Sequence, residues 1–256
     1  MIHATAIVHE SAQIDDTAEI GPYVVIGEGV SIGSGTKVGP HAVIDAWTEI
    51  GSDNHIFQFA SVGASPQDLK FAGEKTILKI GDRNKIREFV TLHRGTSDGG
   101  GETVVGNDNL FMAYAHVAHD CRVGNQVILA NAATLAGHVT VDDAAILGGL
   151  SAIHQFTRIG CHVMLSGGSM VTQDIPPYTM AQGDRAKTIG LNLVGLKRRG
   201  FSREALSAIK GAYKLMFRAN LRQEEALSRI EEEYGSVPEV MVFADFIRGS
   251  ERGVAR

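Results

Sequence analysis

Cysteine, proline and long apolar runs are scarce in this chain of 256 residues. Two cysteines, Cys121 and Cys161, argue against a disulfide scaffold and for a reducing compartment. Six prolines against 30 glycines indicate many special backbone positions and few rigid breaks. No apolar run approaches the roughly 20 residues of a membrane span. The first residues, MIHATAIVHESAQIDD, lack the basic start and apolar core of a signal peptide. We therefore expect a cytoplasmic protein without a transmembrane segment.

A strong excess of one charge is also missing. The chain has 24 Lys+Arg and 29 Asp+Glu, a net charge of −5, which argues against a nucleic-acid or membrane-surface protein. The charge is unevenly spread: residues 1–190 carry 12 basic and 20 acidic side chains, and residues 191–256 carry 12 and 9. The composition also changes near 190, from Ile, Val, Gly and Asn to stretches such as EEALSRIEEEY. We therefore expect a domain over 1–190 and a second over 191–256.

A six-residue repeat dominates the first domain. Every sixth residue from Ile2 to Val62 is Ile or Val, and most positions four after it are small or β-branched. The frame returns at Ile80, and a second register, shifted by one, runs from Val105 to Val171. Period six fits neither an amphipathic helix nor an alternating strand. It predicts a prism-shaped parallel β-helix, in which three hexads close one coil and the coils stack about 4.8 Å apart.

Two segments interrupt this repeat. Residues 63–79 and 93–104 separate the hexads and are expected to leave the β-helix as excursions that replace or decorate a coil. After Val171 the repeat ends, and helical patterns begin at about 191–199, 202–217, 222–234 and 238–247. The fold expected is therefore an all-β prism followed by a small α-helical C-terminal domain.

The coil length of three hexads places every eighteenth residue in one column along the prism. His119, Gly137 and Gln155 fall in one column, and Asp120, His138 and Phe156 fall in the next. His154 and His116 flank these columns. A histidine suits a general base because its ordinary pKa lies close to neutral pH. A glycine one coil away can donate its backbone N–H to a developing oxyanion. There are plainer interpretations: the histidine only forms a hydrogen bond to a loop, and the glycine is an ordinary corner residue. A zinc site built from His116, His119 and Asp120 is a rival one.

The motifs of the chain resemble a known family. AHVAHDCRVGN at 115–125, NAATLAGHVTVDD at 131–143, IHQF at 153–156, IPPY at 175–178 and LKRRGFSREAL at 196–206 resemble UDP-N-acetylglucosamine O-acyltransferase, the first enzyme of lipid A synthesis. QDLKFAGE at 67–74 and IREFVTLHRGT at 86–96 extend the resemblance over the whole chain. It implies a left-handed parallel β-helix assembled as a homotrimer. It also implies transfer of a 3-hydroxyacyl group from acyl carrier protein to the 3-hydroxyl of UDP-N-acetylglucosamine, without a bound metal or cofactor.

The resemblance also implies roles for single residues. His119 matches the general base, Asp120 a supporting carboxylate and Gly137 the oxyanion donor. The substrate-binding residues that it implies are Gln67, Asp68, Lys70, His116, His138, His154, Gln155, Asn192, Arg198 and Arg199. Gly167 matches the position that limits acyl-chain length, and we expect the basic side chains of 197–218 to recruit the acidic carrier.

One departure from the family pattern leaves alternatives open. Two residues after Asn192, members of the family carry Glu, and this chain has Val194. A 3-amino-sugar acceptor, which would give an amide, therefore stays an alternative, as does a hexapeptide-repeat acyltransferase that uses acyl-CoA. A zinc-dependent carbonic anhydrase and a non-catalytic solenoid that binds ice or sugar are further alternatives.

Overall fold

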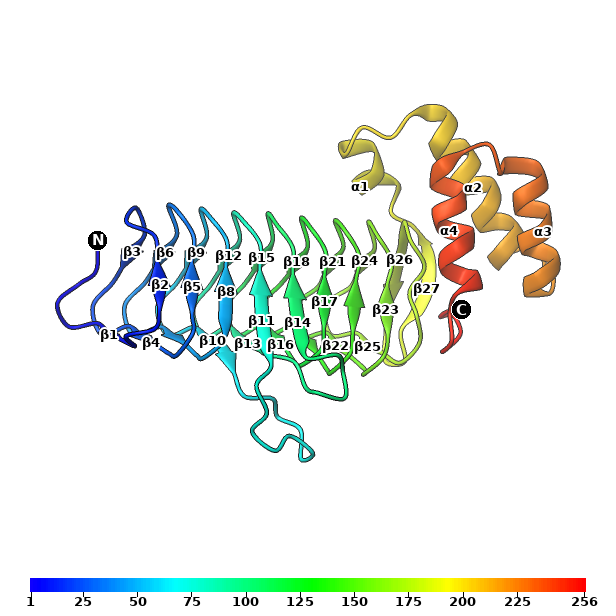
Figure 1. Ribbon diagram of the computed structural model, residues 1–256. Helices are drawn as coiled ribbons and strands as arrows, with labels where there is room; N and C mark the ends of the chain where they lie inside the picture. Colours follow the sequence, from blue (N-terminus) through cyan, green and yellow to red (C-terminus); the bar gives the residue numbers. More distant parts are fainter.

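A three-sided prism of short parallel strands, with helices at its C-terminal end, makes up residues 1–256 of this computed structural model (Figure 1). Successive strands turn from the first sheet to the second, then to the third, and back to the first. Paired strands are offset by three hexads, as in Ile7 with Val25 and His116 with Thr134. The predicted left-handed parallel β-helix with a helical C-terminal part is confirmed.

The strands fall into three sheets. The first sheet has β1 (Ile7–Val8), β4 (Val25–Ile26), β7 (Val43–Ile44), β10 (Ser61–Ala64), β13 (Thr91–His93), β16 (His116–Val117), β19 (Thr134–Leu135), β22 (Ala152–Ile153) and β25 (Met170–Val171). The second has β2 (Gln13–Ile14), β5 (Ser31–Ile32), β8 (Thr48–Ile50), β11 (Ile77–Ile80), β14 (Glu102–Val105), β17 (Arg122–Val123), β20 (Thr140–Val141) and β23 (Arg158–Ile159).

The third sheet closes each coil. It has β3 (Glu19–Ile20), β6 (Lys37–Val38), β9 (His55–Ile56), β12 (Lys85–Ile86), β15 (Leu110–Phe111), β18 (Ile128–Leu129), β21 (Ile146–Leu147), β24 (Met164–Leu165), β26 (Thr179–Gln182) and β27 (Lys187–Leu191). Only β26 and β27 pair antiparallel. We call the turns between the sheets corner 1–2, corner 2–3 and corner 3–1.

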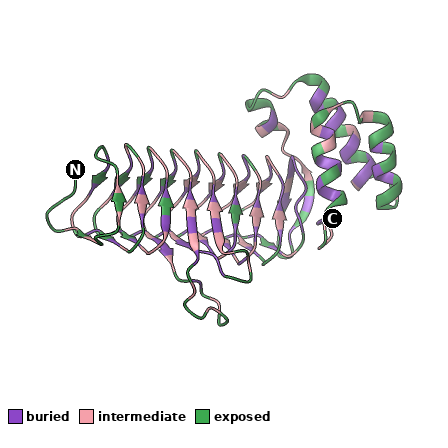
Figure 2. Ribbon diagram, in the orientation of Figure 1, coloured by how far each residue is buried: buried purple, intermediate pink, exposed green.

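The interior of the prism is solid. Each hexad turns its large aliphatic residue inward, and Ile44, Ile86 and Val117 have no exposed surface. Buried residues recur along the strands of the prism (Figure 2). Burial of one such side chain stabilises the fold by roughly 1.5–3 kcal/mol. One cluster of 41 buried residues runs along the whole prism. A substrate must therefore bind on the outside of the prism, at a corner or on a face.

The glycines that directly follow an inward aliphatic residue serve close packing between coils. A Cβ on Gly33 would lie 2.7 Å from the carbonyl of Gly51 in the next coil. The left-handed backbone comes three residues after each inward aliphatic residue, and there glycine occurs at some corners (Gly35, φ 66°) and a side chain at others, as in Asp120 (φ 60°) and His138 (φ 61°). At corner 3–1 these side chains form a ladder of stacked rings with centroids 4.9–5.4 Å apart: Tyr23, His41, Phe59, Phe89 and Tyr114. Stacking between coils offsets part of the cost of the left-handed conformation.

Both excursions leave the prism at corner 1–2 (Figure 1). Ser61 pairs with Thr91, five hexads on instead of three, so the first excursion adds two hexads of chain. It decorates a coil and replaces none, and a whole number of added hexads keeps the repeat in phase. Thr91 meets His116 on the next coil, 25 residues on, so the second excursion adds one hexad and one further residue. That single extra residue explains why the later repeat is shifted by one.

The helices follow the prism as α1 (Leu193–Arg198), α2 (Arg203–Phe217), α3 (Gln223–Tyr234) and α4 (Pro238–Arg248). Ser202 caps α2 by accepting a hydrogen bond from the Ala205 N–H at 3.0 Å. The helices bury a second apolar cluster of 17 residues. The carboxylate of Asp174 accepts from the hydroxyl of Ser250 at 2.7 Å and so ties the C-terminal segment to the prism. No helix has the length and apolar character needed to cross a membrane.

Candidate active site

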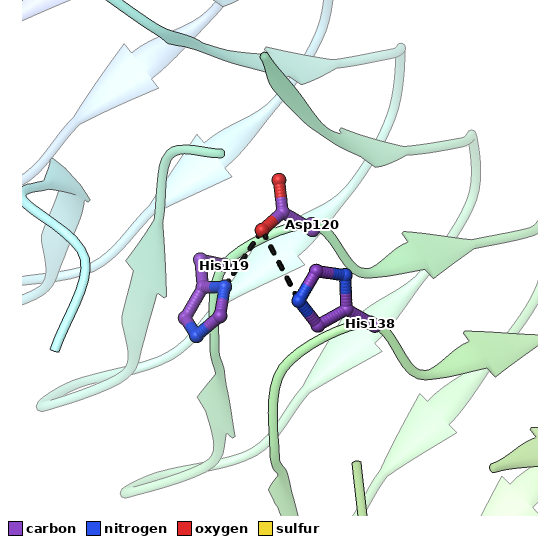
Figure 3. Close-up of side chains that lie close together, drawn as sticks. All are labelled: His119, Asp120 and His138. Atoms are coloured by element: carbon purple, nitrogen blue, oxygen red, sulfur yellow. Dashed lines mark hydrogen bonds and ion pairs between the residues drawn. The ribbon is translucent and has the colours of Figure 1, made fainter. Parts of the chain in front are cut away.

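His119 and Asp120 form a hydrogen-bonded pair at corner 1–2, directly after β16 (Figure 3). The Nδ1 of His119 lies 2.7 Å from the Oδ2 of Asp120. The left-handed backbone at Asp120 turns its carboxylate back toward the ring. The Asp120 side chain is fully buried, and 13% of the His119 side chain remains exposed. The carboxylate of the pair is therefore shielded from solvent, whereas the imidazole is still accessible to a substrate.

The second excursion holds the Asp120 carboxylate in place. Thr96 donates its backbone N–H to Oδ1 at 2.8 Å and its hydroxyl to Oδ2 at 2.7 Å. The backbone N–H of Asp120 in turn donates to the hydroxyl of Thr103 at 2.8 Å. The Oδ2 of Asp120 already accepts from Thr96, and a carboxylate oxygen only accepts, so the imidazole nitrogen beside it has to donate. The Nδ1 of His119 therefore carries its proton, and Nε2 has a free lone pair.

Gly137 lies one coil beyond His119, over the imidazole ring. A Cβ at Gly137 would lie 2.5 Å from Cε1 and 2.7 Å from Nε2 of His119, so a side chain there would displace the ring. Its carbonyl accepts from the N–H of Phe156 at 3.2 Å, whereas its own N–H donates to no group of the protein. Other corners also leave this N–H free, and Gly137 differs from them by the imidazole beneath it. A free donor therefore lies beside a free base.

His138 extends the cluster along the corner. Its ring meets the ring of His119 edge-on at 5.2 Å and stacks on Phe156 at 4.4 Å. Its Nε2 lies 3.7 Å from the Oδ2 of Asp120 (Figure 3). His154 and Gln155 follow at the next coil and are exposed, with the Nδ1 of His154 3.1 Å from the carbonyl of Gln155. The exposed polar groups of this column thus continue the surface at which His119 opens.

Two further imidazoles lie behind His119. The Nδ1 of His116 lies 2.6 Å from the hydroxyl of Thr91, and the His93 ring meets His116 edge-on at 4.9 Å. Burial, and then the neighbouring His119, lowers the pKa of His116. Burial lowers the pKa of His93 to about 4. Both rings are neutral near pH 7, so neither adds a positive charge beside His119.

The same cluster offers candidate ligands for the rival metal chemistry. His119, Asp120 and His138 each present a ligand atom, all within 4.8 Å of one another. Tetrahedral Zn²⁺ with ligands at about 2.0–2.1 Å separates ligand atoms by roughly 3.3 Å. The 2.7 Å between Nδ1 and Oδ2 fits a hydrogen bond instead, and the Thr96 hydroxyl occupies the same oxygen. His116, the third member of the zinc set expected from sequence, contacts Thr91. The geometry fits a hydrogen-bonded acid–base pair better than a metal site.

The other predicted site residues lie elsewhere on the chain. Gln67, Asp68 and Lys70 lie in the first excursion, where the Asp68 carboxylate accepts from the Lys70 N–H at 3.0 Å. No hydrogen bond or ion pair joins these three residues to His119. Gly167 lies at corner 3–1, between β24 and β25, where a Cβ would lie 3.0 Å from the Gly149 carbonyl.

The residues predicted to bind the nucleotide end lie at corner 2–3. Asn192 caps α1 by accepting from the Gly195 N–H at 3.1 Å, and it donates to the carbonyl of His162 at 3.0 Å. Arg199 donates to the side chain of Gln126, and Arg198 is exposed. Because the prism is solid, a single chain does not bring its three corners together. Sequence reasoning missed Thr91, His93, Thr96 and Thr103, although HRGT at 93–96 already belonged to the motif that carried the resemblance.

Comparisons with known proteins agree with this architecture. The profile of bacterial transferase hexapeptide repeats matches residues 5–46 and 102–137, and the profile for domain 2 of Udp N-acetylglucosamine O-acyltransferase matches 174–255. Repeats and prism together define a hexapeptide-repeat transferase.

Solved structures of full-length relatives identify the family. LpxA from Acinetobacter baumannii is 46% identical (TM-score 0.97), with 100% of this chain and 99% of that chain covered. The UDP-N-acetylglucosamine O-acyltransferase (LpxA) from Moraxella catarrhalis is 44% identical, with a TM-score of 0.97 and with 100% of this chain and 99% of that chain covered. The UDP-N-acetylglucosamine acyltransferase LpxA from Bacteroides fragilis is 44% identical, with a TM-score of 0.98 and 100% of both chains covered. This chain belongs to the UDP-N-acetylglucosamine O-acyltransferase family and is an acyltransferase, as the motifs predicted.

Proposed function

We propose that His119 is the general base in the transfer of a 3-hydroxyacyl group from acyl carrier protein to the 3-hydroxyl of UDP-N-acetylglucosamine. Membership of the family makes the chain a UDP-N-acetylglucosamine acyltransferase of lipid A synthesis. The observation that carries the role of His119 is the 2.7 Å hydrogen bond from Nδ1 to the buried Asp120 carboxylate. It leaves Nε2 as the proton acceptor and stabilises the imidazolium that forms.

The proposed reaction takes place in two steps. The Nε2 of His119 takes the proton of the sugar 3-hydroxyl while that oxygen attacks the thioester carbonyl carbon. The Gly137 N–H donates to the developing oxyanion. The tetrahedral intermediate then collapses, the C–S bond breaks, and the phosphopantetheine sulfur leaves with the proton from Nε2. The acyl group arrives on the carrier, so the reaction needs no bound cofactor or metal.

The remaining residues bind the substrates in this proposal. Asp68 contacts the sugar, and Gln67 and Lys70 lie beside the phosphates. His116, His138, His154 and Gln155 line the corner around His119. Asn192, Arg198 and Arg199 bind the nucleotide end. The exposed basic side chains of 197–218 recruit the acidic carrier in the cytoplasm.

A homotrimer completes the site in this proposal. His119 and Gly167 occupy different corners of one solid prism, which supports a site shared between protomers. Exposed apolar side chains also gather on the outer face of the first sheet, at Ile7, Val25 and Val43, and along the ring ladder at corner 3–1. A patch of this kind is typical of an interface between subunits. With that face turned to a three-fold axis, corner 1–2 of one protomer, with His119, meets corner 3–1 of the next, with Gly167.

A substitution at His119 tests the proposal. His119→Ala is expected to lower kcat by about 10²–10⁴-fold, the usual contribution of a general base. The matched control is His9→Ala, because His9 is an exposed histidine near the same corner that hydrogen-bonds only Ser11. A panel of 3-hydroxyacyl carrier proteins, acyl-CoA, UDP-N-acetylglucosamine and its 3-amino analogue identifies donor and acceptor. Turnover near the wild-type value in folded His119→Ala trimers would overturn the assignment of the base.

A further inference from the structure

Arg94 is a buried arginine without a carboxylate partner. It follows β13, is 6% exposed, and forms no ion pair within 4.0 Å. Its Nη1 donates to the carbonyl of Gly63 at 3.0 Å, and its Nη2 donates to the hydroxyl of Ser65 at 3.1 Å. Its Nε is buried and has no partner. A guanidinium stays charged at any working pH, so the fold accepts a costly buried charge here.

Every side-chain hydrogen bond of Arg94 ends on the first excursion, residues 63–79. Gly63 and Ser65 are at its start, and the backbone N–H of Arg94 donates to Ala64 between them at 3.2 Å. The guanidinium carbon also lies 5.5 Å from the ring centre of Phe71 and 5.2 Å from that of Trp47. Contacts of a cation with aromatic faces replace the missing carboxylate.

Phe71 connects Arg94 to the turn that carries Asp68. The N–H of Phe71 donates to the Asp68 carbonyl at 3.1 Å, and the N–H of Lys70 donates to the Asp68 carboxylate at 3.0 Å. Phe71 is half-buried, whereas Lys70 is exposed. The ring of Phe71 therefore fixes a turn whose polar groups face solvent, and Arg94 fixes that ring.

The short segment 93–96, which contains Arg94, also holds the His119–Asp120 pair in place. Residues 93–96 are all buried. Arg94 contacts the first excursion, and Thr96, two residues later, binds both oxygens of Asp120. A buried segment of this length has little freedom to move. It therefore sets the place of the Asp68 turn relative to the coil that carries His119.

We propose that Arg94 is a positioning residue for the sugar-nucleotide, which holds the 67–70 turn in its binding position without touching the substrate. This inference rests on the proposed function of Asp68. A lysine cannot replace the arginine, because one ammonium group lacks the planar fork that reaches two acceptors and two aromatic faces.

Steady-state kinetics of Arg94→Lys tests this inference. We expect the KM for UDP-N-acetylglucosamine to rise about tenfold, which corresponds to the loss of one charge-assisted hydrogen bond, with kcat within about threefold of wild type. The KM for the acyl carrier stays unchanged. Phe71→Leu, which removes the aromatic face at the turn, is expected to give the same pattern. The double variant is expected to be no worse than the poorer single variant, because both break one chain of contacts.

The control is Arg83→Lys, since Arg83 is an exposed arginine that pairs with Asp108 away from the excursion. It is expected to leave both KM values unchanged. A lower melting temperature of Arg94→Lys with an unchanged KM for the sugar-nucleotide would overturn the inference, because it would leave Arg94 a purely structural role. Asp68→Asn separates the two hypotheses. If that variant leaves the KM unchanged, the proposed role of Asp68 fails; if only Asp68→Asn raises it, the role of Arg94 fails.

Discussion

Gly137→Ala is the sharpest test of the proposed catalytic geometry, because the added methyl group would contact the His119 ring and displace it. The φ angle of Gly137 is not in the left-handed region, so alanine meets no backbone strain there. The new Cβ would lie 2.5 Å from Cε1 of His119, whereas carbon atoms in contact lie near 3.5–4.0 Å. The imidazole must therefore move away by about 1 Å.

That movement affects the hydrogen bond to Asp120. The bond is 2.7 Å long, and a displacement of about 1 Å would lengthen it beyond the range of a hydrogen bond. A misplacement of this size costs about 10²-fold in rate, and a poorly oriented base costs more. We expect Gly137→Ala to lower kcat by about 10²–10³-fold, or about 2.7–4.1 kcal/mol of barrier at 1.36 kcal/mol per decade.

The assay compares kcat at saturating substrate concentrations for four variants: Gly137→Ala, Gly190→Ala, His119→Ala and the double variant His119→Ala/Gly137→Ala. Gly190→Ala is the control, because a Cβ at Gly190 meets nothing within 4 Å. In a His119→Ala background, Gly137→Ala is expected to cost almost nothing further, since the ring that it would displace is gone. Melting temperatures are expected to fall by only a few degrees. A folded Gly137→Ala enzyme with kcat within threefold of wild type would refute the view that the ring position under Gly137 matters.

Three further predictions concern the assembly and the substrates. Mixing His119→Ala with Asp68→Ala subunits is expected to restore part of the activity that each variant loses, as a shared site requires; no recovery in verified mixed trimers would place the whole site within one chain. Gly167→Met is expected to shift the preferred acyl donor to a chain several carbons shorter, since each buried CH₂ is worth about 0.8 kcal/mol; an unchanged chain-length ranking argues against Gly167. The KM for acyl carrier protein is expected to rise with salt more than the KM for UDP-N-acetylglucosamine, because the screening length falls from about 10 Å at 0.1 M to about 3 Å at 1 M; equal salt dependence argues against docking on the basic side chains of 197–218.

The sequence predicts most of the fold because the repeat is strict. A coil of three hexads fixes which residues lie above one another, so the relation of His119 to Gly137 and of Asp120 to His138 follows from counting. The structure brings these residues together, and their catalytic roles stay predictions. The helices were also predictable, since caps such as Ser202 mark their starts.

The rest of the site depends on contacts that break the period. Thr96 lies 24 residues before Asp120, a separation that belongs to no column, because the second excursion lengthens its coil by more than a whole hexad. Arg94 reaches Gly63 across 31 residues because the first excursion lies between them. Counting residues by coils no longer predicts which residues are neighbours once an insertion intervenes. The side-chain contacts made by the excursions leave no periodic pattern in the sequence. The repeat therefore located the His119–Asp120 pair and could not locate the residues that support it.

The solid prism of stacked coils has a consequence for how this protein can be shortened or extended. Each coil contacts only the coils before and after it, so stability is close to a sum of nearest-neighbour terms along one dimension. The His119 cluster occupies three consecutive coils, at positions 119, 137 and 155. Its geometry depends on the stacking of these coils and on the second excursion, whose Thr96 holds the Asp120 carboxylate. The coils before the first excursion therefore act as a spacer, whose length can change by whole coils of three hexads while the cluster keeps its shape.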